Sequence, residues 1–489
     1  MRLITIVLTV VIHASIAVAQ PFNIRLSFGT GTPEVGFSCY EVADRYVFVA
    51  GYNDEIAGSR GGAFSLDFDG NILDSNVFFQ DSTVYYLSGA SGGDTNGEII
   101  VAGGIIILPP DLTRIGIVVG FNQLGDTLFT HKYLSPNSEN VRFYKGLITD
   151  SGYLGCGTVD NLNEDDLGSG ILVKFDIEGN FIWRQDYAPQ NNLSVFLYSA
   201  DQTPDGGFLL GGTRISGANN DHLIIKTDSL GNEEWRKVEG NQYHNASANV
   251  AITGDSKYIF CGYHNPFDYN LQYPQVTKLD IDGDVLWTKY YGNPGWSKSA
   301  ECIKLLSDGS FIFCGIDRFE GVHYGMLRKI DADGNEIWYR RYTHTDGIDC
   351  WFNDVTPTSD GGYILTGLLG GDQDLGIEQD MWAMKVDSYG CLVPGCELIN
   401  VDEQHPTAMS IYPNPCDDFI NVYVEAMHVD NCELSLYDIY GKLIRSSPVR
   451  QSGNTLLLES NSLPDGIYVL NLSVDGKVMS SEKVVVRHE

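Results

Sequence analysis

Two short acidic segments have the residue types and spacing that begin a calcium-binding loop. Asp280–Gly283 reads DIDG and Asp331–Gly334 reads DADG, so alternate carboxylates are available as oxygen ligands. Such a loop also needs a glutamate at its twelfth position, which is Tyr291 in one segment and Tyr342 in the other. The pattern therefore favours plain hairpin turns. We expect no cofactor, and calcium is the alternative.

One segment has the spacing of a nucleophilic serine. Gly89–Gly93 reads GASGG and places Ser91 between glycines. A nucleophile elbow needs a strand before the serine and a helix after it. Here a run suited to a strand, Glu98–Gly104, follows instead. We therefore predict a turn and assign no catalytic residue.

Aromatic and histidine side chains gather in long segments between the apolar runs. Aromatic rings present large, stiff contact surfaces to a ligand, and histidines can bind a metal when several converge. The histidines are scattered, which favours solvated loop side chains over a metal site. The candidate ligand-binding residues are Tyr263, His264, Trp296, His323, Tyr324, His344 and Trp351.

A repeat must position these residues. Its pattern is a lysine, one residue, an aspartate, two residues, a glycine with Asn or Asp, and a run that ends in tryptophan. Strong copies are Lys174–Trp183, Lys226–Trp235, Lys278–Trp287 and Lys329–Trp338, and weaker ones start at Ser65, Gly120 and Lys385. The pivotal glycines, 51 to 56 residues apart, are Gly70, Gly125, Gly179, Gly231, Gly283, Gly334 and Gly390.

A second motif alternates with the first. An aromatic or apolar run ends in a small residue and a glycine, as in Tyr258–Gly262 and Phe311–Gly315. Each period then holds four short strands, which is typical of a β-propeller. We predict an all-β chain with a seven-bladed β-propeller over residues 20–400. The small residues, where neighbouring sheets should approach closely, are Ala50, Ala102, Cys156, Gly211, Cys261, Cys314 and Thr366.

The ring needs a closing strand. The seventh repeat, Cys350 to about Cys396, lacks a fourth strand because Pro394 interrupts it. Phe22–Phe28 is an orphan strand before the first repeat, so we predict that it completes the last blade and removes the exposed edges. The Asp-Gly and Asp-x-x-Gly-Asn hairpins then share one face. The long segments with the candidate residues share the opposite face.

Repetition gives several side chains a structural interpretation. The lysines and tryptophans recur from blade to blade, which favours an ion-pair ladder and packing over a site. The cysteines permit disulfides in an exported protein. Cys391 and Cys396 flank a Pro-Gly turn, and we predict that they pair. Cys302 and Cys314 are placed to face each other across a hairpin.

The first residues have the form of a cleavable export signal. Arg2 precedes a short apolar run, and Ala17-Val18-Ala19 is a small-residue cleavage site. We therefore predict a signal peptide over residues 1–19. The net charge of −33 repels nucleic acid and anionic membranes, so both are discounted as partners. We expect no transmembrane segment in the mature chain.

The last 80 or so residues differ in composition and carry a specific set of motifs. Tyr412-Pro413-Asn414-Pro415 comes first, then LYDIYGKLI with Gly441, LPDGIYVLNL with Gly466 and Tyr468, and a terminal EKVVV. These resemble the type A sorting domain of the type IX secretion system of Bacteroidetes. The resemblance implies a small β-sandwich at 410–489 after a linker at 401–409. It also implies the secretion machinery as partner, and a product that is secreted or anchored to the outer cell surface.

Two classes of function stay open for the propeller. The first is a non-enzymatic module that binds a glycan, a peptide or an envelope protein through the long-loop face. The alternative is an extracellular polysaccharide hydrolase or lyase. The repeats contain no polar cluster that departs from the repeat pattern, and this counts against an enzyme. Cys416 and Cys432 lie outside the sorting motifs, and we predict that they pair with each other.

Overall fold

The structure is a computed structural model. It describes residues 20–27, 34–42, 44–54, 58–78, 84–93, 100–108, 113–122, 124, 126–137, 139–160, 168–188, 193–216, 219–240, 245–265, 272–292, 298–319, 321–344, 348–370, 379–392, 408–412, 414–425, 432–438, 442–449, 455–474 and 477–488. The predicted signal peptide lies outside these residues.

The chain divides into two compact units, Met1–Leu392 and Val393–Glu489. Every regular element in the described residues is a β-strand. The predicted all-β class is therefore confirmed. Each unit is considered separately below.

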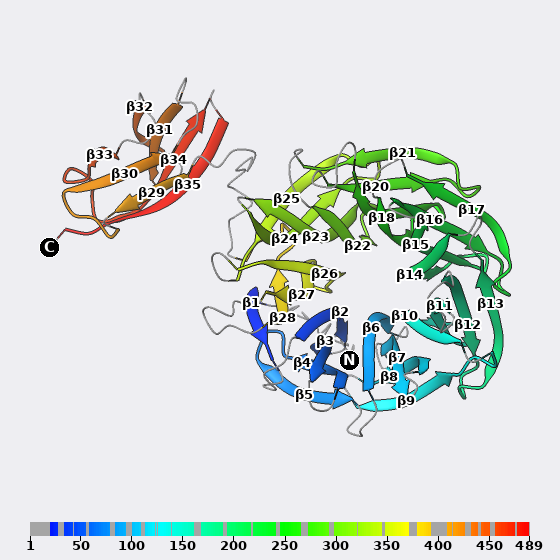
Figure 1. The fold of residues 1–489 in the computed structure, drawn as a ribbon. Helices are drawn as coiled ribbons and strands as arrows, with labels where there is room; N and C mark the ends of the chain where they lie inside the picture. The colour runs from blue at the N-terminus through cyan, green and yellow to red at the C-terminus, as the bar shows by residue number, and fades with distance from the viewer. Residues whose placement is uncertain are drawn as a thin grey trace, which may run out of the picture. The chain divides into compact units, whose positions relative to one another are not determined.

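The described part of the first unit contains seven four-stranded antiparallel sheets around a common axis (Figure 1). Sheets 1 and 2 contain β2 (Glu34–Val42), β3 (Arg45–Asp54), β4 (Gly58–Leu66), β5 (Ile72–Phe78), β6 (Val84–Gly93), β7 (Ile100–Leu108), β8 (Thr113–Phe121) and β9 (Thr127–Tyr133). Sheets 3 and 4 contain β10 (Asn140–Thr149), β11 (Gly152–Asp160), β12 (Ser169–Phe175), β13 (Phe181–Tyr187), β14 (Ser194–Gln202), β15 (Phe208–Ser216), β16 (Asn219–Thr227) and β17 (Glu233–Glu239).

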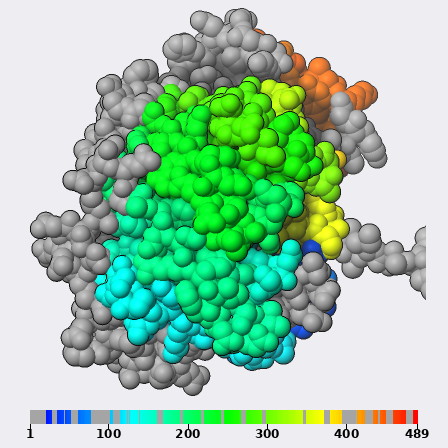
Figure 2. Space-filling model, turned by 90° about the vertical axis from the view of Figure 1, so that its right-hand side faces the viewer, coloured from blue at the N-terminus to red at the C-terminus, as the bar shows by residue number. Residues whose placement is uncertain are grey.

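Sheets 5 and 6 contain β18 (Ala246–Ile252), β19 (Tyr258–His264), β20 (Tyr273–Leu279), β21 (Val285–Tyr290), β22 (Ser299–Leu305), β23 (Phe311–Phe319), β24 (Val322–Ile330) and β25 (Glu336–Tyr342). Sheet 7 contains β26 (Cys350–Pro357), β27 (Tyr363–Leu369), β28 (Asp380–Val386) and β1 (Phe22–Leu26). In each sheet the first-numbered repeat strand lies nearest the axis (Figure 1). Successive sheets follow one another in colour order over the surface (Figure 2). This is the arrangement of a β-propeller.

Sheet 7 closes the ring with strands from both ends of the repeat region. β1 pairs antiparallel with β28, in a register that runs from Phe22 opposite Lys385 to Leu26 opposite Met381. The predicted closing strand is confirmed. The pairing satisfies the backbone edge that β28 would otherwise leave open.

A tryptophan on the outer strand of one sheet packs on the turn glycine of the next. The indole N–H of Trp235 donates to the carbonyl oxygen of Ile281 at 3.2 Å, and its ring lies against Gly283. Trp183, Trp287 and Trp338 pack in the same way on Gly231, Gly334 and Gly390. Gly231 has φ 78°, and a Cβ added there would lie 2.9 Å from the Trp183 ring. The repeated tryptophans therefore have the packing role that was predicted, and they exert it between neighbouring sheets.

The repeated lysines also have structural partners. Four of the five reach an aspartate in the turn that joins the first two strands of their own sheet: Lys226–Asp205 at 2.8 Å, Lys278–Asp255 at 3.6 Å, Lys329–Asp308 at 2.9 Å and Lys385–Asp360 at 2.9 Å. Lys174 donates to Thr149 Oγ1 instead. The predicted ion-pair ladder is therefore confirmed in four of the five sheets. It ties the third strand of a sheet to the turn that joins its first two strands.

The core of the ring lies between the faces of adjacent sheets. Between sheets 6 and 7, the rings of Phe352 and Trp382 stack with centroids 4.2 Å apart, beside Leu327 and Cys314. Gly211 shows why the column of small residues is needed, because a Cβ there would collide with the carbonyl oxygen of Ala248 in the next sheet. The close approach predicted for this column is therefore present at Gly211.

The second unit contains two sheets. β29 (Ala408–Tyr412), β30 (Phe419–Glu425) and β33 (Thr455–Glu459) form one sheet, and β32 (Leu443–Val449), β31 (Cys432–Asp438), β34 (Gly466–Val474) and β35 (Lys477–Val486) form the other. Ile420, Val422, Leu436, Leu470 and Val484 belong to its buried core. β29 begins at Ala408, inside the segment predicted as a linker, because it pairs with β30 as the edge strand of its sheet.

Candidate functional site

The described members of the predicted ligand-binding set belong to sheets 5, 6 and 7. Tyr263 and His264 end β19, where the His264 ring lies 4.6 Å from that of Tyr290. His323 and Tyr324 are on β24, and the backbone N–H of His323 donates to Asp349 Oδ1 at 2.7 Å.

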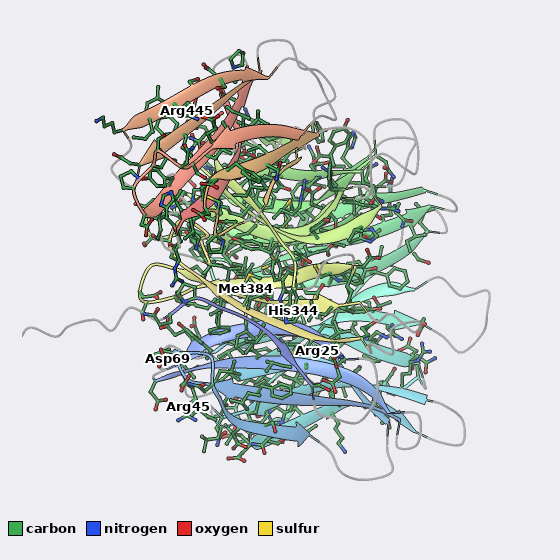
Figure 3. All side chains as sticks on the ribbon, turned by 90° about the vertical axis from the view of Figure 1, so that its left-hand side faces the viewer. Arg25, Arg45, Asp69, His344, Met384 and Arg445 are labelled. Carbon is green, nitrogen blue, oxygen red and sulfur yellow. The ribbon has the colours of Figure 1, made fainter. Side chains whose placement is uncertain are left out.

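His344 follows β25 and lies near Arg25 of β1 (Figure 3). Burial, followed by the Arg25 charge, lowers the pKa of His344. Trp351 is on β26 opposite Leu368, and Trp296 lies outside the described residues. His323, His344 and Trp351 thus lie around Cys350, whose Sγ donates to the carbonyl oxygen of His323, whereas Tyr263 and His264 lie in sheet 5.

The innermost strands share a feature that the sequence did not reveal. Each has a β-bulge near its middle, so two or more of its residues oppose one on the next strand. The register shifts lie between Gly36 and Ser38, Leu87 and Gly89, Phe143 and Lys145, Leu197 and Ser199, Ala246 and Asn249, Ala300 and Cys302, and Phe352 and Asp354. A bulge changes the direction of a side chain, so it can supply side chains to the axis of the ring.

This feature corrects one prediction. Gly89–Gly93 lies within β6 and is not a turn. β6 carries two register shifts, the second between Ser91 and Gly93. Glycines are common at bulges because they adopt unusual backbone conformations, and this explains the glycine-rich sequence inside a strand.

Aromatic and charged side chains form an arc along the innermost strands of sheets 3, 4 and 6 and the second strand of sheet 5. The Arg142 guanidinium donates to Tyr144 Oη at 3.1 Å and lies 5.6 Å from the centre of that ring. Tyr144 meets Tyr198 edge-on with centroids 5.0 Å apart. Tyr198 is close enough to Tyr263 to interact electrostatically, and Tyr263 likewise to Glu301. We call Arg142, Tyr144, Tyr198, Tyr263 and Glu301 the axial arc.

All five side chains of the axial arc are half-buried. Burial and the nearby Glu301 carboxylate raise the pKa of Tyr263 to about 12, and burial raises the pKa of Glu301. Ser299 Oγ donates to Glu301 Oε1 at 2.5 Å. The arc therefore offers flat aromatic faces flanked by a cation at one end and a carboxyl group at the other.

Residues further along β10, β14 and β22, together with one from β26, form an ionic cluster. Lys145, Asp201, Lys304 and Asp354 come from sheets 3, 4, 6 and 7, and their charges interact with one another. Lys304 Nζ lies 3.8 Å from Asp354 Oδ1, and Cys302 Sγ donates to the same oxygen at 2.9 Å. Side chains from such distant parts of the ring can meet only near its axis. We call these five residues the axial cluster.

Burial shifts the pKa values of a lysine and an aspartate of the axial cluster in opposite directions. It lowers the pKa of Lys145, to which the positive charge of Lys304 adds, and it raises the pKa of Asp201. Both shifts favour the neutral form, as expected for charges withdrawn from water. A lysine and a carboxyl group with altered proton affinities can donate and accept hydrogen bonds or exchange protons with a polar ligand.

The acidic turns use their carboxylates internally. Asp280 Oδ1 accepts the backbone N–H groups of Asp282 at 3.0 Å and Asp284 at 2.8 Å. Asp331 does the same for Asp333 and Asn335. These are Asx-type hairpin turns, as the sequence predicted.

The sorting motif joins the two ends of the second unit. Asn414 Nδ2 donates to the carbonyl oxygen of Lys483 at 2.6 Å, and its Oδ1 accepts the N–H of Val485 at 2.8 Å. Tyr468 Oη donates to the carbonyl oxygen of Pro464 at 2.8 Å. Tyr412 lies in β29 and Gly466 begins β34, whereas Pro413 and Gly441 lie outside the described residues.

The cysteine predictions have mixed outcomes. Cys391 is disulfide-bonded, and its predicted partner Cys396 lies outside the described residues. Cys416 is a free thiol that donates to the carbonyl oxygen of Val485. The predicted Cys416–Cys432 bond is therefore wrong. Cys416 instead forms a β-bridge with Val486 of β35, and its thiol points to the neighbouring carbonyl of Val485. Cys302 and Cys314 lie opposite each other, as predicted.

Residues 410–487 match the sequence profile of the secretion system C-terminal sorting domain. This part of the chain is a type IX secretion sorting domain. The sorting domain directs secretion or outer-surface attachment, and its partner is the type IX secretion machinery. No curated protein matches the chain. Within the described part, no helix is long and apolar enough to cross a membrane.

Several solved structures resemble the chain at very low sequence identity. The polysaccharide lyase Uly1 is 9% identical, with TM-score 0.43 and coverage of 72% of this chain and 90% of that one. The α-L-arabinofuranosidase Arb93A of Fusarium graminearum is 10% identical, with TM-score 0.40 and coverage of 61% and 91%. YCF48 bound to a D1 peptide is 11% identical, with TM-score 0.39 and coverage of 75% and 95%. Likenesses at this level carry no argument about function.

Proposed function

We propose that this exported protein is a non-enzymatic binding module whose propeller holds a carbohydrate chain on the axial arc. The observation that carries the proposal is the pair of ring contacts Arg142–Tyr144 and Tyr144–Tyr198, which Tyr263 and Glu301 extend within electrostatic range. Half-buried aromatic faces with a few polar groups are typical of small-molecule and sugar sites. The balanced charges of the axial cluster favour a ligand with many hydroxyl groups over a strongly charged one.

In this proposal each segment of the chain has its own role. Residues 1–19 are the signal peptide, 20–400 the seven-bladed propeller, 401–409 the linker and 410–489 the sorting domain. The sorting domain brings the propeller to the outer surface or the medium. There the axial arc of the propeller binds extracellular glycans.

The test uses the full secreted chain on a glycan array, followed by calorimetry with the best ligand. Tyr198→Ala and Tyr263→Ala should each weaken binding at least about tenfold, because each removes an aromatic face worth about 1.4 kcal/mol or more. Tyr389→Ala is the matched control, since Tyr389 is 51% exposed in a turn of sheet 7. Affinity unchanged in both arc variants, with melting temperatures near wild type, would overturn the assignment.

The axial cluster also supports a second candidate, an extracellular polysaccharide hydrolase or lyase. The specific observation is the pair of opposite pKa shifts at Lys145 and Asp201. Incubation of the array's best polysaccharide with the protein separates the two functions. New reducing ends that are formed by wild type and not by Lys145→Met or Asp201→Asn would establish catalysis. A polymer that stays intact would exclude catalysis on it and favour the binding module.

A further inference from the structure

Cys302 of the axial cluster faces a second cysteine on the adjacent strand. Cys302 of β22 and Cys314 of β23 are direct partners in the antiparallel register. Both contact the same apolar cluster between sheets 6 and 7, where Cys314 is fully buried and Cys302 partly so. Their side chains therefore leave the sheet on the same face.

Directly opposed residues of an antiparallel pair have Cα atoms about 4.5–5.5 Å apart. A disulfide needs a Cα separation of about 4.4–6.8 Å. The backbone of β22 and β23 can therefore accept a bond between the two sulfur atoms without moving the strands apart.

The equivalent positions in other sheets provide an internal comparison. Cys156 and Cys261 occupy the same column as Cys314, but they lie opposite Lys145 and Asn249. Their thiols donate to the carbonyl oxygens of Ser199 and Ala300 in the next sheet. Of these three column cysteines, Cys314 alone has a cysteine partner across the strand.

Cys302 is joined to the other members of the axial cluster by a hydrogen bond to Asp354. Cys302 Sγ donates to Asp354 Oδ1 at 2.9 Å, while Oδ2 accepts the N–H of Cys39 at 3.2 Å. Lys304 approaches the same Oδ1. The thiol hydrogen of Cys302 therefore takes part in fixing Asp354, which is 6% exposed.

We propose that Cys302 and Cys314 form a cross-strand disulfide when the chain enters an oxidising compartment, and that this bond changes the partners of Asp354. Both thiols lose a proton, one S–S bond forms, and two electrons pass to the disulfide of a thiol–disulfide oxidoreductase, which leaves as a dithiol. Asp354 then loses the thiol donor and keeps Lys304 and the Cys39 N–H. The disulfide-bonded Cys391 is a precedent in this chain.

Burial determines when the bond can form. Cys314 is 0% exposed, and burial raises the pKa of the Cys302 thiol to about 12, so reactive thiolate is scarce in the folded ring. Exchange therefore precedes the packing of sheet 6 against sheet 7. The finished disulfide is shielded from reductants until the ring opens.

Peptide mass spectrometry of the full exported chain tests the bond. The protein is purified without reductant, denatured in an alkylating agent and digested. We expect the Cys302 and Cys314 peptides to be joined and unalkylated, with Cys156 and Cys261 alkylated as matched controls. Alkylation of both Cys302 and Cys314 in most molecules would overturn the proposal.

Thermal unfolding gives an independent readout. A reductant that acts on the unfolding chain should lower the melting temperature of wild type more than that of Cys302→Ser, which retains the Cys391 disulfide. Cys314→Ala serves if the serine variant fails to fold. Equal reductant effects in wild type and variant would count against the cross-strand bond.

Discussion

Two lysines in the same repeat position differ in burial, and this difference makes the ion-pair ladder testable. Lys385 and Asp360 have side chains 0% and 7% exposed, whereas Lys329 and Asp308 are 16% and 56% exposed. We consider replacing each lysine with methionine, which keeps the length of the apolar stem and removes the charge. Both variants lose one ion pair of nearly the same length.

The expected losses differ by several kcal/mol. Lys385→Met leaves the Asp360 carboxylate buried, where Thr358 Oγ1 and the Gly362 N–H still donate to it. Removal of one partner from a buried pair costs about 3–5 kcal/mol. Lys329→Met leaves an aspartate that water can solvate, so its loss should be about 0–1 kcal/mol.

Urea unfolding followed by tryptophan fluorescence measures the difference. All seven tryptophans lie before residue 393, so the signal reports on the ring and not on the sorting domain. Adding Asp360→Asn to Lys385→Met should recover part of the loss, because the stranded charge is removed. Similar losses of unfolding free energy in the two single variants would refute the reasoning. They would show that the ion pair itself, and not the burial of its aspartate, determines the loss of stability.

Three further predictions follow from other contacts. Gly231→Ala should destabilise the ring by about 1–3 kcal/mol more than Gly309→Ala, because both have positive φ but only Gly231 faces the Trp183 ring; equal urea midpoints would contradict this. Burial lowers the pKa of His222 to about 3 from its usual 6.5, so the unfolded chain binds the extra proton and stability falls as the pH drops below 6.5. Wild type should lose about 3 kcal/mol more than His222→Phe between pH 7 and pH 4, and identical pH profiles would exclude the effect. Asn414→Ala should lower the melting temperature of the second unit, because the N–H of Val485 loses its acceptor; calorimetry checks this, and an unchanged transition would show that the bond contributes little.

The repeats predicted much of the ring because each signal is local. The glycine spacing, the closing strand at Phe22 and the lysine column each follow from side-chain periodicity or from counting strands. The Trp235–Gly283 contact was foreseen only as packing. Its partner lies in the next sheet, and sequence periodicity alone does not identify contacts between repeats.

The axial arc was largely missed for a different reason. Of its members only Tyr263 was predicted. The candidates were taken from the long segments between the apolar runs, and the other four residues lie on the innermost strands. Tyr144, Tyr198 and Glu301 lie at or beside the bulges, and a bulge inserts a residue that disrupts the alternation from which side-chain direction is read. Recurrent aromatic residues within predicted inner strands were the available signal.

The pairing of β1 with β28 has a consequence for the order of folding. Phe22 and Lys385 are partners although nearly the whole repeat region separates them in the chain. Sheets 1 to 6 can form from adjacent strands as soon as each repeat is available, whereas sheet 7 must wait for the two ends to meet. Until then the ring is an open arc with exposed edges. The ring can therefore close only after its last repeat is available.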